Sequence, residues 1–160
     1  MYSHTHPKGK FYLKILMLLA VFGMLVSAYL TYQHFKPVGG AFCNVNDYVS
    51  CDIVNKSIYA EIFHIPVAIL GFTAYVIIFA VAFGLLKEKI PSYALKLTAL
   101  FTGASLGFSI YLTTMEFFVL QAVCIFCVTS QIIILLIFII SLNLWLKHRR
   151  WLAHSSSLSS

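Results

Sequence analysis

The sequence predicts an all-α integral membrane protein, in which four spanning helices form a bundle and a long outer loop joins the first two. The chain has 160 residues, of which 61% are hydrophobic and only 10% are charged. A soluble domain has about 45–50% apolar and about 25% charged residues, so this chain has too few charges to cover a water-exposed surface. These values exclude a soluble globular enzyme and a disordered chain.

The formal charge of +6 does not indicate a nucleic-acid partner. The 11 Lys and Arg residues lie in short clusters between long uncharged segments, and they form no basic stripe along a predicted helix. Such clusters are typical of the loops and ends of membrane proteins. The charge therefore indicates orientation in the membrane, and no nucleic acid is expected to bind.

A helix needs about 20 mostly apolar residues to cross the hydrocarbon layer, because only a helix satisfies its own backbone hydrogen bonds there. Four segments meet this requirement, at about residues 11–32, 65–86, 93–118 and 124–146. Pro66 is suited to the first turn of the second segment. We therefore expect one membrane domain over residues 1–150, with an outer loop at 33–64 and a flexible tail at 151–160.

The basic residues predict which ends of the spans face the cytoplasm. Only Lys36 and Lys56 lie on one side of the predicted spans. The other side carries the remaining basic residues, which are Lys8, Lys10, Lys14, Lys87, Lys89, Lys96, Lys147, Arg149 and Arg150. We expect that side to be cytoplasmic, with both termini inside. A secretory signal cleaved after Val26-Ser27-Ala28 is the alternative for the N-terminus, but its apolar run is long for a signal.

All four cysteines are predicted to lie on the outer side: Cys43 and Cys51 in the outer loop, and Cys124 and Cys127 at the start of the fourth span. An oxidising compartment on that side allows disulfides to persist. In C-x-x-C the two sulfurs share one helix face, and amides at a helix N-terminus favour the reactive thiolate. A second pair within reach predicts a relay, because thiol–disulfide exchange passes electrons between pairs.

Two other interpretations of the cysteines stay open from the residues alone. The four could form static disulfides that brace the outer loop of a non-enzymatic membrane protein. They could also bind zinc, although such sites usually combine two closely spaced cysteine pairs, and seven residues separate Cys43 from Cys51. We expect no metal.

From Cys51 the sequence reads C-D-I-V-N-K-S-I-Y-A-E-I-F-H-I-P-V-A-I-L-G. A cysteine followed by V, S and Y, and then by I-P-V-A-x-L-G leading into a span, resembles the vitamin K epoxide reductase family. Four spans, a loop pair after the first and C-x-x-C at the start of the fourth agree with it. The DsbB family carries its cysteine pairs in the reverse order. The resemblance covers about residues 11–146 and is closest to bacterial-type members.

The resemblance implies a membrane thiol–quinone oxidoreductase that generates disulfides. Cys124 and Cys127 look like the active-site pair, with Cys127 facing a quinone (ubiquinone, menaquinone or a vitamin K-type quinone). Cys43 and Cys51 look like shuttle cysteines, with Cys51 exchanging with Cys124. Ser57 matches a polar residue near the quinone, although its position alone favours a helix cap.

The resemblance also implies a place and a partner. The expected location is the bacterial inner membrane, with the active site on the periplasmic side. Many bacterial relatives carry a fused thioredoxin-like domain, for which this chain has no room. We therefore expect a separate thioredoxin-like protein of the DsbA type as partner, besides the quinone and the lipid bilayer.

Two residues depart from the family pattern, and other features give weaker signals. His64 replaces a usual glycine, and we expect it to point toward the headgroups rather than to titrate at the site. Gln131 replaces a tyrosine of the animal enzymes, which puts epoxide reduction in doubt. Glu116 is expected to be an interfacial carboxylate. The apolar residues between Tyr48 and Phe63 are expected to cap the quinone pocket.

Overall fold

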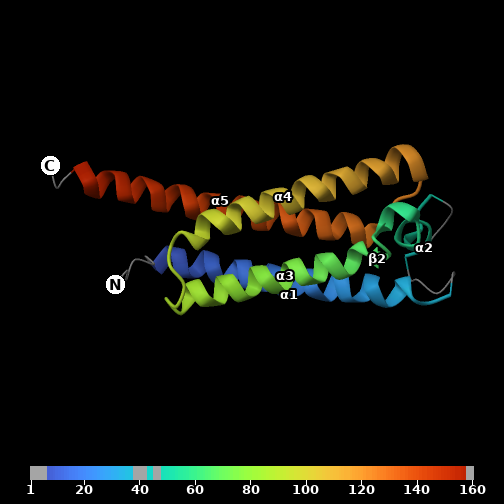
Figure 1. The fold of residues 1–160 in the computed structure, drawn as a ribbon, viewed down its shortest axis with the longest axis horizontal. Helices are drawn as coiled ribbons and strands as arrows, with labels where there is room; N and C mark the ends of the chain where they lie inside the picture. Colours follow the sequence, from blue (N-terminus) through green and yellow to red (C-terminus); the bar gives the residue numbers. More distant parts are fainter. Residues whose placement is uncertain (1–6, 38–42, 45–47, 158–160) are drawn as a thin grey trace.

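The computed structural model describes residues 7–37, 43–44 and 48–157. It contains four long helices, which run side by side as a bundle (Figure 1). They are α1 (Pro7–His34), α3 (Val67–Leu86), α4 (Ala94–Met115) and α5 (Ile125–Ser157). The connection from α1 to α3 holds the short helix α2 (Cys51–Asn55), the 3-10 helix η1 (Ile58–Ala60) and a hairpin of β1 (Glu61–Ile62) and β2 (Ile65–Pro66). A π-helical turn, η2 (Glu116–Leu120), extends α4.

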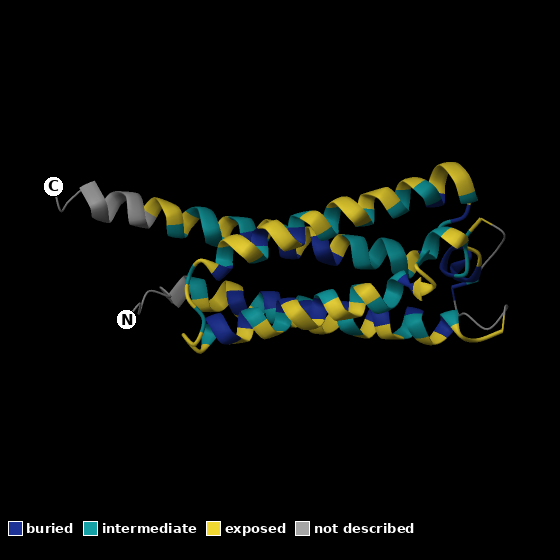
Figure 2. Ribbon diagram, viewed as in Figure 1, coloured by how far each residue is buried: buried dark blue, intermediate teal, exposed yellow. Residues whose placement is uncertain are grey.

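All four long helices are long and apolar enough to cross a membrane. The qualifying segments are Gly9–His34, Val67–Leu86, Ala94–Leu120 and Ile125–Arg150. Exposed positions run along the outward faces of these helices (Figure 2), and they include large apolar side chains such as Leu18 and Leu25. An apolar exterior suits lipid and not water. The prediction of a multi-pass four-helix bundle is confirmed.

Two helix ends lie well outside the predicted bounds. Helix α1 begins at Pro7, which fits the first turn of a helix because its missing N–H needs no partner there. Helix α5 continues to Ser157, so residues 151–157 of the predicted flexible tail prolong this helix. Neither glycine nor proline interrupts the sequence between residues 125 and 157, and Leu, Lys, Arg and Ala favour helix. The loss of apolar character thus marks the end of the span, but not of the helix.

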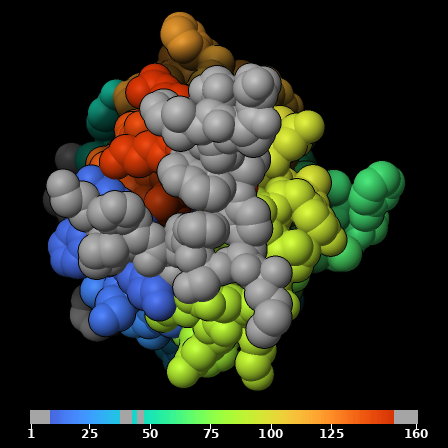
Figure 3. Space-filling model, turned by 90° about the vertical axis from the view of Figure 1, so that its left-hand side faces the viewer, coloured from blue at the N-terminus to red at the C-terminus, as the bar shows by residue number. Residues whose placement is uncertain are grey.

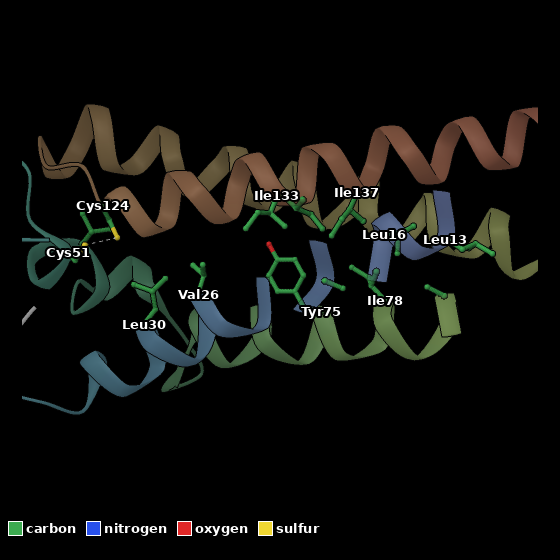
Figure 4. Packing of buried hydrophobic residues seen from close by; sticks show 14 of the residues in the cluster. Leu13, Leu16, Val26, Leu30, Cys51, Tyr75, Ile78, Cys124, Ile133 and Ile137 are labelled. Atoms are coloured by element: carbon green, nitrogen blue, oxygen red, sulfur yellow. Dashed lines mark hydrogen bonds between the residues drawn. The ribbon is translucent and has the colours of Figure 1, made fainter. Parts of the chain in front are cut away.

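Helix α1 belongs to the core of the bundle. Its buried residues Leu16 and Ala20 share one apolar cluster with Tyr75 and Ile78 of α3 and with Ile137 of α5, and Figure 4 shows several of these side chains. A Cβ atom at Gly23 would lie only 2.5 Å from the Tyr75 ring, so the glycine permits this close approach. The Tyr75 hydroxyl in turn donates to the Ser130 carbonyl of α5 at 3.0 Å.

The basic clusters meet at one end of the bundle, as the sequence predicts. Lys10 pairs with Glu88, between α3 and α4, at 3.4 Å. The ammonium group of Lys147 lies 5.1 Å from the centre of the Tyr12 ring. The start of α1 and the end of α5 are at this same end, and α2 and β2 are at the other (Figure 1). The assignment of the basic end to the cytoplasm stays a prediction from the charges.

The hairpin between η1 and α3 projects sideways from the bundle. In the end-on view of Figure 3 it is the green segment at the right edge. Its turn consists of Phe63 (φ 52°) and His64 (φ 63°), and two successive positive φ angles characterise a tight hairpin turn that favours glycine and asparagine. The Phe63 side chain is 93% exposed.

Candidate functional site

The outer loop is held in shape by a polar network around its disulfide. A disulfide joins Cys43 to Cys51, the first residue of α2. The Asn44 carbonyl oxygen accepts from the Ser50 hydroxyl at 3.0 Å and from the Asp52 backbone N–H at 3.2 Å. The Asn44 amide donates to Asp52 Oδ2 at 2.6 Å, and Lys56 lies 3.2 Å from Asp52 Oδ1. The buried Asp52 carboxylate is therefore neutralised and hydrogen-bonded.

Backbone contacts fix this loop against the bundle. Val49 forms an isolated parallel bridge with Val123, whose N–H donates to the Tyr48 carbonyl at 2.8 Å. From α2, the side-chain amide of Asn55 donates to the Leu30 carbonyl of α1 at 2.7 Å. These contacts tie residues preceding and following Cys51 to the residue just before Cys124 and to the end of α1.

The two cysteine pairs come together at this junction. Cys124 Sγ lies 3.3 Å from Cys51 Sγ, although 73 positions separate them in the sequence (Figure 4). Both residues are almost completely buried. Cys124 and Cys127 are free thiols, while the loop pair is a disulfide. The structure thus brings the predicted loop pair and the predicted active-site pair into direct contact through one cysteine of each.

The C-x-x-C motif begins α5, as predicted. Cys124 immediately precedes the first helical residue, and its sulfur accepts a hydrogen bond from the Cys127 backbone N–H at 3.3 Å. This is the position and the bond of an N-capping side chain, with sulfur in place of the usual oxygen. Cys127 is one turn further on, and its side chain lines a cavity inside the bundle.

Glu116 is not the interfacial carboxylate that the sequence led us to expect. The residue is only 3% exposed, and its Oε2 accepts a hydrogen bond from the Cys124 backbone N–H at 3.2 Å. The Cys127 thiol also interacts with this carboxyl group. The π-helical turn that begins at Glu116 directs its side chain inward toward the cysteines, so the expectation is wrong.

The cavity has a volume of about 440 Å³ and lies between α1, α3, α4 and α5 beneath the outer loop. Volumes of about 300–1,000 Å³ with mostly apolar walls and a few polar groups are typical of small-molecule sites. The polar groups here include Ser57, Asn55, Ser130, Glu116 and Cys127. Of the apolar residues expected to cap the pocket, Val54 and Ile62 line this cavity from the loop, whereas Ile53, Ile58 and Phe63 are exposed and do not.

Ser57 lines this cavity together with Cys127. It precedes η1, but its side chain makes no capping bond to that helix. Its hydroxyl instead donates to the Val54 carbonyl at 2.8 Å, which leaves the lone pairs of the oxygen for another donor. The helix cap that its position alone favours is therefore not what the structure contains.

The two departures from the family pattern lie outside the cavity wall. The His64 side chain is fully exposed, which agrees with the expectation that it points away from the site. The Gln131 carbonyl oxygen accepts a hydrogen bond from the Thr113 hydroxyl, and both residues line a second pocket that lies between α4 and α5. Neither His64 nor Gln131 is among the described residues that line the main cavity.

The polar residues of the site that were not foreseen include Asn55, Tyr75 and Ser130. Asn55 and Ser130 are polar residues next to candidate site elements, but no motif distinguishes them from surface residues. Tyr75 lies in the middle of an apolar span, where a hydroxyl needs a partner, and that was the one available signal. Its hydroxyl contacts both the carbonyl and the side chain of Ser130 at the cavity wall.

The profile of the vitamin K epoxide reductase family matches residues 14–142. The chain belongs to the vitamin K epoxide reductase family. The matched range contains all four cysteines, the outer loop and most of the four apolar helices. Family membership implies a membrane enzyme that exchanges electrons between cysteine pairs and a quinone, and the arrangement of the cysteines in this member agrees with that chemistry.

Proposed function

We propose that the protein is a membrane thiol–quinone oxidoreductase that generates disulfides in a partner protein. Electrons pass from a thioredoxin-like partner to Cys43–Cys51, then to Cys124–Cys127, and finally to a quinone. The 3.3 Å separation of Cys51 Sγ and Cys124 Sγ, beside an apolar cavity that Cys127 lines, carries this proposal.

The first half of the reaction is thiol–disulfide exchange at the loop. A reduced partner gives two electrons to the Cys43–Cys51 disulfide, and the partner is released as a disulfide. The Cys51 thiolate then attacks Cys124 of an oxidised Cys124–Cys127 pair, and Cys43 resolves the mixed disulfide. The supporting observation is that Cys51, and not Cys43, is the loop cysteine in contact with Cys124.

The second half takes place in the cavity. A quinone bound there accepts two electrons and two protons, and ubiquinone, menaquinone and vitamin K-type quinones share this chemistry. The volume of about 440 Å³ and the mostly apolar wall suit a quinone ring. The Asn55 amide has a second N–H besides the one that donates to Leu30, and the Ser57 hydroxyl can donate to a quinone carbonyl oxygen once it turns away from the Val54 carbonyl. Cys127 supplies the thiol that faces the ring. Cys124 then closes the disulfide with Cys127.

The partner and the location follow from the same scheme. We propose a separate DsbA-type protein, because carriers of that type have potentials of about −120 mV and need a strongly oxidising acceptor such as a quinone. The proposed location is the bacterial inner membrane, with the loop on the periplasmic side. The concentration of basic residues at the opposite end of the bundle supports this orientation.

The Cys127→Ser variant tests the order of transfer. In this variant the Cys124 thiolate can attack Cys51 of the Cys43–Cys51 disulfide, which releases the Cys43 thiol and forms a Cys51–Cys124 mixed disulfide. Without Cys127 no thiol on the bundle side resolves this linkage, so it should accumulate. We expect non-reducing electrophoresis and mass spectrometry of the peptides to detect this linkage, and Cys127→Ser/Cys124→Ser to lack it. If the single variant instead keeps Cys43–Cys51 and only loses thermal stability, the disulfides brace the loop and the relay is wrong.

A second experiment tests the electron acceptor. The four thiols are alkylated in native membranes with quinone synthesis intact and then blocked. We expect free thiols to accumulate when quinone is absent, because the relay has no outlet. The same oxidation state in both conditions would contradict a quinone-linked role.

A further inference from the structure

We propose that Glu116 is the proton acceptor for the Cys127 thiol when electrons leave the C-x-x-C pair. This inference rests on the proposed function and assigns the carboxylate a chemical role within it. It follows from the position of Glu116, from its burial without a counterion and from its contacts with both cysteines of the motif.

A break in helix geometry sets the position of Glu116. The residue starts the π-helical turn η2, in which the wider backbone loop displaces side chains relative to a regular α-helix, and such turns often occur at functional sites. Gln121 then ends the turn in a left-handed conformation (φ 49°), and the Ala122 N–H bonds back to the Glu116 carbonyl at 3.3 Å. The chain therefore turns around Glu116 and brings Cys124 against its side chain.

The two buried carboxylates of the site have different surroundings. Asp52 is paired with Lys56 and bonded to Asn44, so its charge is compensated. Glu116 is equally buried, yet it forms no ion pair with any Lys, Arg or His in the part of the chain that the structure describes. Burying a carboxylate without a counterion is costly, and in a membrane helix it indicates a functional group.

The contacts of Glu116 are with the reacting groups. Its Oε2 accepts from the Cys124 backbone N–H, the carboxyl group interacts with the Cys127 thiol, and the residue lines the cavity beside Cys127. A purely structural tie to the Cys124 N–H would need only an uncharged acceptor, such as a glutamine side chain. The carboxylate adds the capacity to take up and release a proton.

The two thiols of Cys124 and Cys127 lose two protons and two electrons, both S–H bonds break, and one S–S bond forms. The quinone receives the two electrons and two protons and becomes the hydroquinone. Glu116 takes the proton from the Cys127 thiol and passes it to a quinone oxygen in the same cavity, so its own protonation state is restored at the end of the turnover.

Two substitutions separate proton transfer from positioning. Glu116→Gln keeps an oxygen that accepts from the Cys124 N–H but cannot accept a proton, whereas Glu116→Asp keeps a carboxyl group. The full-length protein is reduced in detergent and mixed with ubiquinone-1 or menadione. We expect Glu116→Gln to slow single-turnover quinone reduction about 100-fold, with no change in the quinone concentration that gives half the maximal rate. Glu116→Asp should restore most of the rate. Glu61→Gln, a substitution in an acid outside the cavity wall, should leave the rate unchanged.

A second readout needs no quinone. Infrared difference spectra are recorded while a dithiol reduces Cys124–Cys127 in the quinone-free protein. We expect a carboxyl band that changes with the redox state of the pair, that is lost in Glu116→Gln and that shifts in Glu116→Asp. Identical difference spectra of the wild type and Glu116→Gln, or equal single-turnover rates for these two proteins, would overturn the proton-acceptor role.

The outcome also separates this inference from the proposed function. If the wild-type protein with intact thiols reduces neither quinone, the thiol–quinone function itself fails. If the wild type reduces quinone and Glu116→Gln does so at the same rate, the function stands and Glu116 only holds the turn. A Glu116→Gln protein that lacks the Cys43–Cys51 disulfide has misfolded, and the infrared spectrum of Glu116→Asp then decides.

Discussion

The loop side and the bundle side of the cysteine junction are built by different forces. Cys51 lies in a segment held by hydrogen bonds and charge, in which Asn44 bonds to Ser50 and Asp52. Cys124 instead begins a long apolar helix that packs in the bundle, above a cavity with mostly apolar walls. The position of each sulfur therefore depends on a separate set of interactions. Each side should therefore respond to substitution independently of the other.

The largest expected effect comes from Cys51→Ser, which disconnects the two sides. Turnover driven by a reduced thioredoxin-like protein should fall at least about 1,000-fold, or about 4 kcal/mol in activation free energy. Quinone reduction driven by a small dithiol, which reduces Cys124–Cys127 directly, should persist. Parallel assays with the two reductants measure both values.

Cys124→Ser is the matched control for this variant, because it should lose both activities. Partner-driven turnover that survives in Cys51→Ser would mean that the partner reaches Cys124 without the loop. The separation into two sides would then be wrong.

An intermediate effect is expected from Asn44→Ala, which weakens the loop alone. The change removes the acceptor for Ser50 and for the Asp52 N–H and leaves buried polar groups unpaired, at about 1–3 kcal/mol. The yield of the trapped Cys51–Cys124 disulfide in a Cys127→Ser background should fall, and limited proteolysis should cleave the loop faster. Asn143→Ala, which removes an exposed bond within α5, should change neither. A large drop in the thermal stability of the whole bundle would show that loop and bundle are not independent.

The smallest effect is expected at the hairpin turn. His64 has a φ of 63°, a conformation that costs an L-residue roughly 1–2 kcal/mol and that glycine adopts freely. His64→Gly should therefore raise stability slightly, measured by thermal unfolding in detergent, while quinone reduction stays the same. Ile65→Gly, in the adjacent strand, should lower stability by about 0.5–1 kcal/mol. A loss of stability in His64→Gly would mean that the imidazole contributes through its approach to Glu61 at 4.0 Å.

The four helices were well predicted from the sequence because a helix that crosses a bilayer is recognised by its length and its apolar composition. Apolar runs of the necessary length are visible without any tertiary information, and the structure confirms each one within a few residues. The end of α5 was missed for the complementary reason. Helix propensity continues through the polar residues after Lys147, where membrane hydropathy ends.

The site was only partly predictable from the sequence. The contact between Cys51 and Cys124 was expected from the family resemblance, since no spacing rule brings together residues 73 positions apart. Glu116 was misjudged because its burial depends on a π-helical turn, which hydrophobic periodicity does not reveal. Asn55 was missed because its partner is a backbone carbonyl 25 residues earlier. Such contacts arise from the packing of the loop onto α1 and have no local signature.

The bridge between Val49 and Val123 determines where the chain can vary in length. Cys51 follows one of the bridged residues by two positions, and Cys124 follows the other by one. An insertion or deletion in either short interval would turn a sulfur away from its counterpart, because side chains alternate along extended backbone. The bridge consists of backbone atoms, so it tolerates changes of side chain at both positions. The number of residues in the segments 49–51 and 123–124 is therefore constrained, whereas the side chains of Val49 and Val123 can change; Ser50 and the two cysteines are also constrained in identity by their own contacts.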